Sequence, residues 1–367
     1  MSTNKNQFCS ILLFIVVVGV VVFPCLCGVV YAGTVSLPKT GQTTSYAAGD
    51  DGELQVGVAW PYPRFKDNGD QTVGLIWTKD AGTPTVGRCT GGTITWQGAL
   101  DYVACLNAAN YLGHNDWRLP NINELESLVN AGHYATASWL NSQGFVNVQS
   151  YKYWSSTTYA VNTSDAWYIV IRIGELHTYD KNLANHFAWP VRSGQTGAVA
   201  NSPVCSTGQK TSYAAGDDGA LQKGVAWPNQ RFKNNSNGTV TDNLTGLMWT
   251  KDASVPRAVS CTGDVKNWQG ALEYVKCLNT GSYLGYSDWR LPNRKEMLSL
   301  IDRERHAPVL SSGHPFENTQ SNSYWSSTTD ANTTSDTFAI DMNIGDIYSA
   351  SRSYDLYGLA GTFHTGR

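Results

Sequence analysis

The sequence predicts two tandem α+β domains, and an internal duplication is the main observation behind this prediction. The segment SYAAGDDGELQVGVAWPYPRF, which begins at Ser45, returns as SYAAGDDGALQKGVAWPNQRF at Ser212. Each copy covers roughly 150 residues, the usual size of one domain with its own core. Further matched landmarks are Trp60/Trp227, Trp77/Trp249, Trp96/Trp268, Trp117/Trp289 and Tyr153/Tyr324.

A first helix is predicted in each copy by apolar residues at helical spacing. It runs from Trp96 to Leu106 in the first copy, with Thr95 as its N-cap, and from Trp268 to Leu278 in the second. A second helix is predicted after Asn121, because Asn121 and Glu124 form an Asn variant of the capping box before a buried apolar stripe. The second copy restates this box with Asn293 and Glu296.

The later part of each copy predicts antiparallel strands. Apolar residues alternate from Trp167 to Ile173 and again from Phe338 to Ile344, and each run precedes a glycine. We expect each to be a hairpin limb with one buried face, which completes an α+β unit. The first copy closes with an apolar strand over 187–192. The Gly-rich 360–363 of the second copy predicts that this strand is missing and that the second domain is the less stable one.

The N-terminus predicts export. Residues 11–23 are almost entirely apolar, Lys5 precedes them, and Val30-Tyr31-Ala32 follows, as in a secretory signal peptide cleaved after Ala32. An uncleaved membrane anchor is the alternative, since the apolar stretch could extend to Val30. The expected organisation is a signal peptide over 1–32, a first domain over 33–193, a linker over 194–211 and a second domain over 212–367.

Charge and cysteine content narrow the possible partners. Without Lys5 the mature chain has 25 basic residues (26 minus one) against 29 acidic ones, a net charge of −4, so nothing suggests nucleic acid or an anionic membrane as partner. Cys89 and Cys105 are sixteen residues apart, and Cys261 and Cys277 repeat the spacing. In an oxidising compartment one disulfide per domain is the simplest account, and zinc is improbable because no further shared ligand accompanies either pair. Cys205 is left as a free thiol or an intermolecular bridge.

The order of motifs resembles a known family. Gly-Leu-x-Trp, Trp-x-x-Ala-Leu, a cysteine, Asp-Trp-Arg-Leu-Pro-Asn and Tyr-Trp-Ser-Ser-Thr occur in this order in both copies. This order is similar to the C-terminal domain of the Legionella collagen-like adhesin, long catalogued as a domain of unknown function. The resemblance implies two C-type-lectin-like domains and surface adhesion. One branch of the family binds sulfated glycosaminoglycans, whereas this acidic chain lacks the basic excess that such binding favours.

Two sets of shared residues are candidates for a site. One is a charged cluster that forms either a ligand-facing network or, as we favour, a structural pair that locks a turn to the second helix. The other is Trp154 and Trp325, which either stack on a sugar or, as we favour, lie in the core. The charged cluster comprises Asp116, Arg118 and Glu124 with their partners Asp288, Arg290 and Glu296.

Catalysis finds little support in the sequence. No metalloprotease, hydrolase or phosphate-loop motif occurs, no His is matched between the copies, and no cofactor is indicated. An enzyme related to the formylglycine-generating enzymes is the least favoured alternative, because that redox chemistry needs reactive cysteines. The sequence therefore predicts an exported module for carbohydrate binding or adhesion to a cell-surface partner, located in the periplasm, at the cell surface or outside the cell. A structural or assembly module of the bacterial envelope is the alternative.

Overall fold

The computed structural model describes residues 35–61, 64–66, 69–70, 74–194, 204–255, 257–258 and 260–363. The predicted signal peptide over 1–32 lies outside these residues, as do residues 195–203 of the predicted linker. Residues 35–194 are called the first repeat below, and residues 204–363 the second repeat. Both belong to one unit, Gly33–Arg367.

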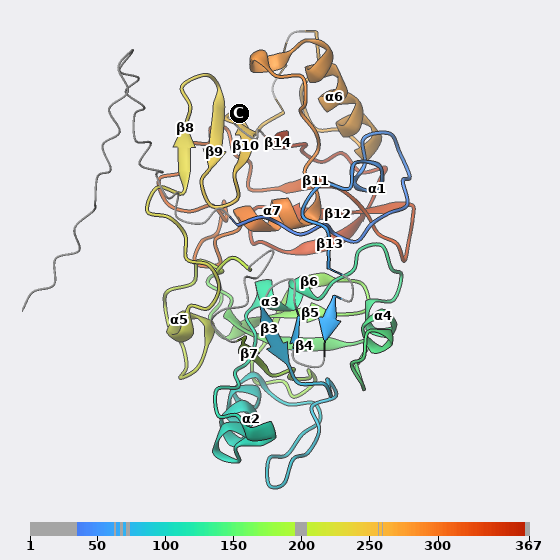
Figure 1. The fold of residues 1–367 in the computed structure, drawn as a ribbon. Helices are drawn as coiled ribbons and strands as arrows, with labels where there is room; N and C mark the ends of the chain where they lie inside the picture. Colours follow the sequence, from blue (N-terminus) through green and yellow to red (C-terminus); the bar gives the residue numbers. More distant parts are fainter. Residues whose placement is uncertain are drawn as a thin grey trace, which may run out of the picture. The chain divides into compact units, whose positions relative to one another are not determined.

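A six-stranded antiparallel sheet runs through both repeats (Figure 1). Its strand order is β11-β12-β13-β6-β5-β4, and the two halves join where Ile347 of β13 lies opposite Leu176 of β6. The sheet therefore does not stop at the boundary between the repeats. Its strands are β4 Lys152–Thr158, β5 Asp165–Val170, β6 Glu175–Asp180, β11 Ser323–Thr329, β12 Asp336–Asp341 and β13 Ile347–Ser351.

Each repeat also has a four-stranded sheet of its own, ordered β1-β2-β3-β7 in the first and β14-β10-β9-β8 in the second. The strands of the first are β1 Phe65–Lys66, β2 Gly69–Asp70, β3 Leu75–Trp77 and β7 Val191–Ser193. The strands of the second are β8 Phe232–Asn234, β9 Thr239–Asp242, β10 Leu247–Thr250 and β14 Gly361–Phe363.

The expectation that the second copy lacks its closing strand is wrong. In the second repeat Gly361 lies opposite Trp249, as Val191 lies opposite Trp77 in the first. The strand forms because its pairing uses backbone groups, which the Gly-rich tail has in full. Glycine also fits here, since a Cβ at Gly361 would lie 3.1 Å from the Trp249 ring.

The two predicted helices of each repeat are present, and the predicted residues cap their N-termini. Helix α2, Trp96–Ala108, is capped by Thr95, and α6, Trp268–Thr280, by Asn267. Both short helices α3, Ile122–Ser127, and α7, Arg294–Leu300, begin with the predicted capping box. The sequence did not predict α1 Asp51–Leu54, α4 Thr136–Ser142, α5 Asp218–Leu221 or the 3₁₀ turns η1 Tyr111–Gly113 and η2 Tyr283–Gly285.

The central sheet is covered on both faces, which corrects the expectation of one buried face. In β5, Trp167 and Ile169 pack in a cluster that includes α3 residues, whereas Ala166 and Tyr168 pack on the α2 side. The first of these clusters contains buried side chains from both repeats, among them Leu125 and Met297. The two repeats thus share one core.

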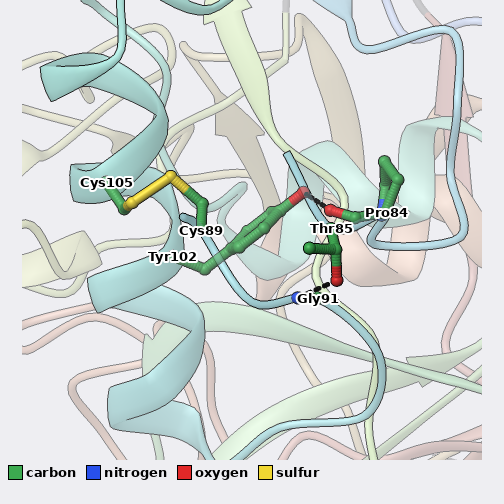
Figure 2. The surroundings of a disulfide bond; sticks show 6 residues. All are labelled: Pro84, Thr85, Cys89, Gly91, Tyr102 and Cys105. Carbon is green, nitrogen blue, oxygen red and sulfur yellow. Dashed lines mark hydrogen bonds between the residues drawn. A yellow bond between two sulfur atoms is a disulfide. The ribbon is translucent and has the colours of Figure 1, made fainter. Parts of the chain in front are cut away.

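One disulfide closes each repeat, as predicted. Cys89 bonds Cys105, and Cys261 bonds Cys277. Figure 2 shows the first of these beside Tyr102, whose hydroxyl donates to the Pro84 carbonyl at 2.7 Å. Both bonds tie a loop to the long helix that follows it. Cys205 is buried and free.

Two straps cross between the repeats. We call residues 35–60 the first strap and residues 204–227 the second strap. The Gln42 side chain of the first strap donates to the Thr329 carbonyl at 3.0 Å and accepts from the Thr329 amide at 3.1 Å. Gln209 of the second strap makes the same pair of bonds with Thr158 of the first repeat. Each strap therefore caps an edge strand of the opposite repeat.

Candidate functional site

The predicted charged cluster divides into a buried pair and a surface residue. Arg118 donates to both carboxylate oxygens of Glu124 at 2.5 and 2.6 Å, and Glu124 also accepts from the Asn121 amide at 2.9 Å. Arg290 and Glu296 form the same bidentate pair in the second repeat at 2.6 and 2.5 Å. All four side chains are buried, so these pairs hold the Trp-Arg-Leu-Pro turn against its helix.

The aspartates of this cluster lie on the surface. Asp116 pairs with Arg192 of β7 at 2.7 Å, and this hydrogen bond lowers the pKa of Asp116. Asp288 is exposed, and the strand position of Arg192 is taken by Thr362 in the second repeat. The Arg–Glu pairs therefore have the same geometry in the two repeats, whereas the strand residue beside the aspartate differs between them.

Trp154 and Trp325 are completely buried. Their indole N–H groups donate to the carbonyls of Ile94 at 2.9 Å and Lys266 at 2.8 Å. The Ser155 hydroxyl donates inward as well, to the Trp167 carbonyl at 2.8 Å. These residues are core, and a sugar cannot reach the two rings in this conformation.

Two buried aspartates of the straps were missed by the sequence reasoning. Asp218 accepts from the hydroxyls of Thr157 at 2.8 Å and Thr207 at 2.6 Å, and burial raises its pKa to about 7. Asp51 has the equivalent bonds to Thr40 and Thr328, and burial raises its pKa to about 6. The repeated Gly-Asp-Asp-Gly was the available signal, but only the crossing of the straps shows what its second aspartate contacts.

Tyr46 and Tyr213 are exposed aromatic residues that both repeats share, with exposed fractions of 37% and 38%. Each lies beside a cation that covers a buried tryptophan of the opposite repeat. The Lys181 ammonium is 5.4 Å from the Tyr213 ring centre and 4.1 Å from that of Trp96. We call this arrangement and its counterpart, Tyr46 with Arg352 and Trp268, the twin tyrosine sites.

The backbone at each tyrosine is held by the first aspartate of Gly-Asp-Asp-Gly. The amide of Tyr46 donates to Asp50 at 2.6 Å, and the amide of Tyr213 donates to Asp217 at 2.6 Å. Both aspartates are completely buried and cap the helix that follows. The tyrosine rings are therefore presented from a fixed loop, which limits the entropy lost when a ligand binds.

The cations of the twin tyrosine sites are already partly bonded. Lys181 donates to the Thr158 hydroxyl at 2.8 Å and the Thr163 carbonyl at 2.9 Å, and burial lowers its pKa to about 8. Arg352 donates to the hydroxyls of Thr329 at 2.5 Å and Thr337 at 3.1 Å. Each cation thus joins the tyrosine ring of a strap to hydroxyl groups of the opposite repeat.

Within the described residues, no group of three or more His, Cys, Asp or Glu side chains is arranged to hold a metal ion. One cavity of about 50 Å³ lies between the repeats, which is far below the size of a pocket for a sugar or cofactor. Among the exposed large apolar and aromatic side chains of the described residues, Tyr46 and Tyr213 are the two tyrosines that occupy equivalent positions in both repeats. The same part of the chain contains no helix long and apolar enough to cross a membrane.

These observations define a class of protein, a duplicated α+β module with one disulfide in each repeat and aromatic residues displayed on fixed loops. The Lcl C-terminal domain family model matches residues 68–192 and 238–359, so the chain belongs to this family and carries two tandem copies. The resemblance drawn from the motifs is therefore confirmed, and the family is one of surface-associated modules. A search of curated proteins found no match to the chain.

Proposed function

We propose that this protein is an exported binding module that recognises an extracellular glycan or a cell-surface partner through the twin tyrosine sites. The observation that carries the proposal is that Tyr46 and Tyr213 are exposed at equivalent positions of both repeats. Tyrosine presents a large amphipathic ring at low entropic cost, which suits the flat faces of sugars and of protein epitopes.

Three properties support this function. The family is surface-associated, and the two disulfides fit an oxidising compartment outside the cytoplasm. Lys181 and Arg352 beside the tyrosines favour a ligand with an acceptor or a negative group next to its stacking face. Two sites in one chain would raise the affinity for a repeating ligand through avidity. We also infer that each repeat is a C-type-lectin-like module, a fold in which loops carry the binding residues.

A glycan array probed with wild type and with tyrosine variants tests the proposal. We expect Tyr46→Ala and Tyr213→Ala each to weaken binding about tenfold or more through lost avidity, and the double variant to lose it. Tyr151→Ala is the matched control, because Tyr151 is 68% exposed and the second repeat has Asn322 at its place. Binding that survives in the double variant, with thermal stability unchanged in all variants, would reject these sites.

A structural or assembly module of the envelope is the second candidate. It is favoured by the burial of Trp154 and Trp325, the tryptophans of the shared Tyr-Trp-Ser-Ser-Thr motif. A chain that binds no glycan or cell surface, yet co-purifies with envelope fragments regardless of Tyr46 and Tyr213, would support it. An enzymatic role has less support, because four of the five cysteines in the described residues are in disulfides. Burial also raises the pKa of the fifth, Cys205, to about 12.

A further inference from the structure

The contact between the repeats is close to two-fold symmetric. The cavity of about 50 Å³ between them is lined by ten residues that form five equivalent pairs, one member of each pair from either repeat. Helices α3 and α7 face this cavity from opposite sides. The pairs are Leu37/Val204, Pro38/Cys205, Asn123/Lys295, Glu126/Leu298 and Ser127/Ser299.

The charges at this contact break the symmetry. On α3 the first repeat has Ile122, Asn123 and Glu126, whereas α7 has Arg294, Lys295 and Leu298 at the same positions. The first repeat thus supplies one acidic side chain, and the second supplies two basic ones. We call Glu126, Arg294 and Lys295 the seam triad.

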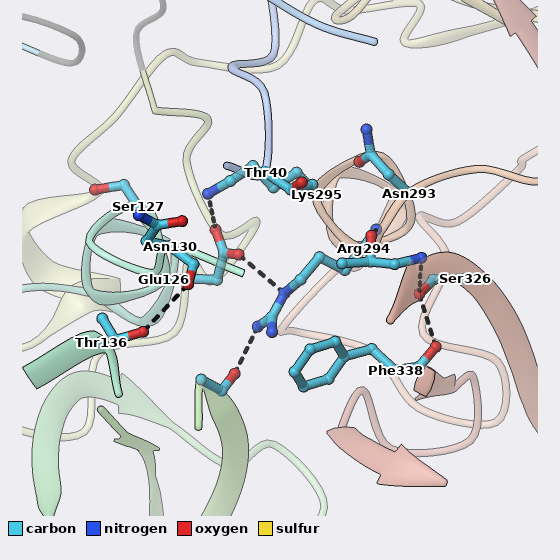
Figure 3. A network of polar contacts seen from close by, with 12 residues as sticks. Thr40, Glu126, Ser127, Asn130, Thr136, Asn293, Arg294, Lys295, Ser326 and Phe338 are labelled. Carbon is cyan, nitrogen blue, oxygen red and sulfur yellow. Dashed lines mark hydrogen bonds and ion pairs between the residues drawn. The ribbon is translucent and has the colours of Figure 1, made fainter. Parts of the chain in front are cut away.

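The members of the seam triad contact one another across the repeats (Figure 3). Lys295 Nζ lies 3.1 Å from one oxygen of Glu126, and Arg294 Nε lies 3.4 Å from the other. Arg294 also donates to the Gly174 carbonyl of the first repeat at 2.5 Å, and its guanidinium covers the Phe338 ring at 4.2 Å. These contacts join α7 to both α3 and the turn before β6.

All three charges of the seam triad are buried, with exposed fractions of 3% for Glu126, 0% for Arg294 and 4% for Lys295. A buried charge is tolerated only when a partner compensates it. A contact between two first repeats would bury two copies of Glu126 without Arg294 or Lys295 to compensate them. A contact between two second repeats would bury two copies each of Arg294 and Lys295 without Glu126.

We propose that the seam triad is the recognition code by which the first repeat selects a second repeat as its partner. The face of each repeat that carries its part of the seam triad is an interaction surface for an Lcl-type repeat of opposite charge. Within one chain, the two repeats bind each other through these faces. If the internal match is broken, the same surface selects the matching repeat of another copy of this chain. The inference is independent of the twin tyrosine sites, which combine strap tyrosines with Lys181 and Arg352, the residues that follow β6 and β13.

Two single charge reversals in the full chain test this code. Glu126→Lys leaves three cations at the contact, and Lys295→Glu leaves two facing carboxylates. We expect each variant alone to unfold about 5–10 °C lower than wild type. In a mixture, the lysine introduced into one chain can face the glutamate introduced into the other, and the second contact of that pair has the wild-type charges. The mixture refolded from denaturant is therefore expected to form a complex with the two variants in equal number, measured by native mass spectrometry.

Matched variants separate the code from general destabilisation. The chain with both reversals, Glu126→Lys and Lys295→Glu, should regain most of the lost stability and refold as a monomer. Asp101→Lys, a reversal at an exposed position of α2, should leave stability unchanged and form no complex with Lys295→Glu. The proposal is overturned if the single variants stay stable monomers in the mixture. It is equally overturned if the mixture aggregates while the chain with both reversals folds.

Discussion

The buried carboxyl of Asp218 makes stability depend on pH. Burial raises the pKa of this carboxyl from 3.8 to about 7. Between these two pH values, Asp218 of the folded protein keeps a proton that the unfolded chain has released. A raised pKa contributes stability that is complete below the unfolded value and is lost as pH rises through the folded value. The shift of about three units corresponds to ~4 kcal/mol between pH 4 and pH 8.

Replacement of Asp218 by asparagine removes this proton. The amide oxygen can still accept from Thr157 and Thr207, while a buried NH₂ without a partner costs about 1–3 kcal/mol. At pH 8 the loss of the ~4 kcal/mol ionisation penalty exceeds this cost, so we expect Asp218→Asn to be more stable than wild type by about 1–3 kcal/mol. At pH 4 the variant is expected to be the less stable protein.

Urea denaturation at pH 4, 6 and 8 measures the effect as a difference in midpoint at constant slope. Asp101→Asn, the same substitution at an exposed position of α2, is the control. An equal loss of stability at pH 4 and pH 8 in Asp218→Asn would refute the reasoning, because it would mean that the native carboxyl is already ionised at pH 4.

Two further predictions concern the contact between the repeats. Because the central sheet and one core cluster run through both repeats, calorimetry should show a single cooperative transition, and not an earlier unfolding of the second repeat. Two separate transitions would contradict this. At the junction of β6 and β13, His177 is held between Asp346 and Glu175. Burial opposes its charge, but these carboxylates raise its pKa to about 9. Its stabilising contribution is therefore present below pH 6.5 and lost as pH rises through 9. His177→Gln should lower the midpoint of urea denaturation at about pH 6 and leave it nearly unchanged at about pH 10, and an equal effect at both would be evidence against this pair.

The local elements of this protein could be predicted because their signals are local. A capping box needs only Asn121 and Glu124 three residues apart, and the disulfides follow from an equal spacing of cysteines in both copies. The family was also within reach, because its motifs occur twice in the same order.

Long-range pairing was not predictable in the same way. Gly361 does not resemble a strand residue, yet its backbone pairs with Trp249 at a place where a Cβ would lie only 3.1 Å from the Trp249 ring. The paired Ser-Ser-Thr-Thr runs gave no sign that Thr157 and Thr328 would contact a strap from the opposite repeat. Such contacts depend on the topology of the whole chain. The identity of a single side chain does not reveal which distant segment it will contact.

The sequence by itself determined the duplication, the helices α2, α3, α6 and α7 with their caps, the disulfides and the family. Only the tertiary structure decided that the repeats share a sheet and a core, that the straps cross, and that Tyr46 and Tyr213 are exposed while Trp154 is buried. The physical reason is that hydrogen bonding within a helix or turn depends on residues a few positions apart. Burial, by contrast, depends on which distant segments meet, and here these segments bring Glu126 of the first repeat within 3.1 Å of Lys295 of the second.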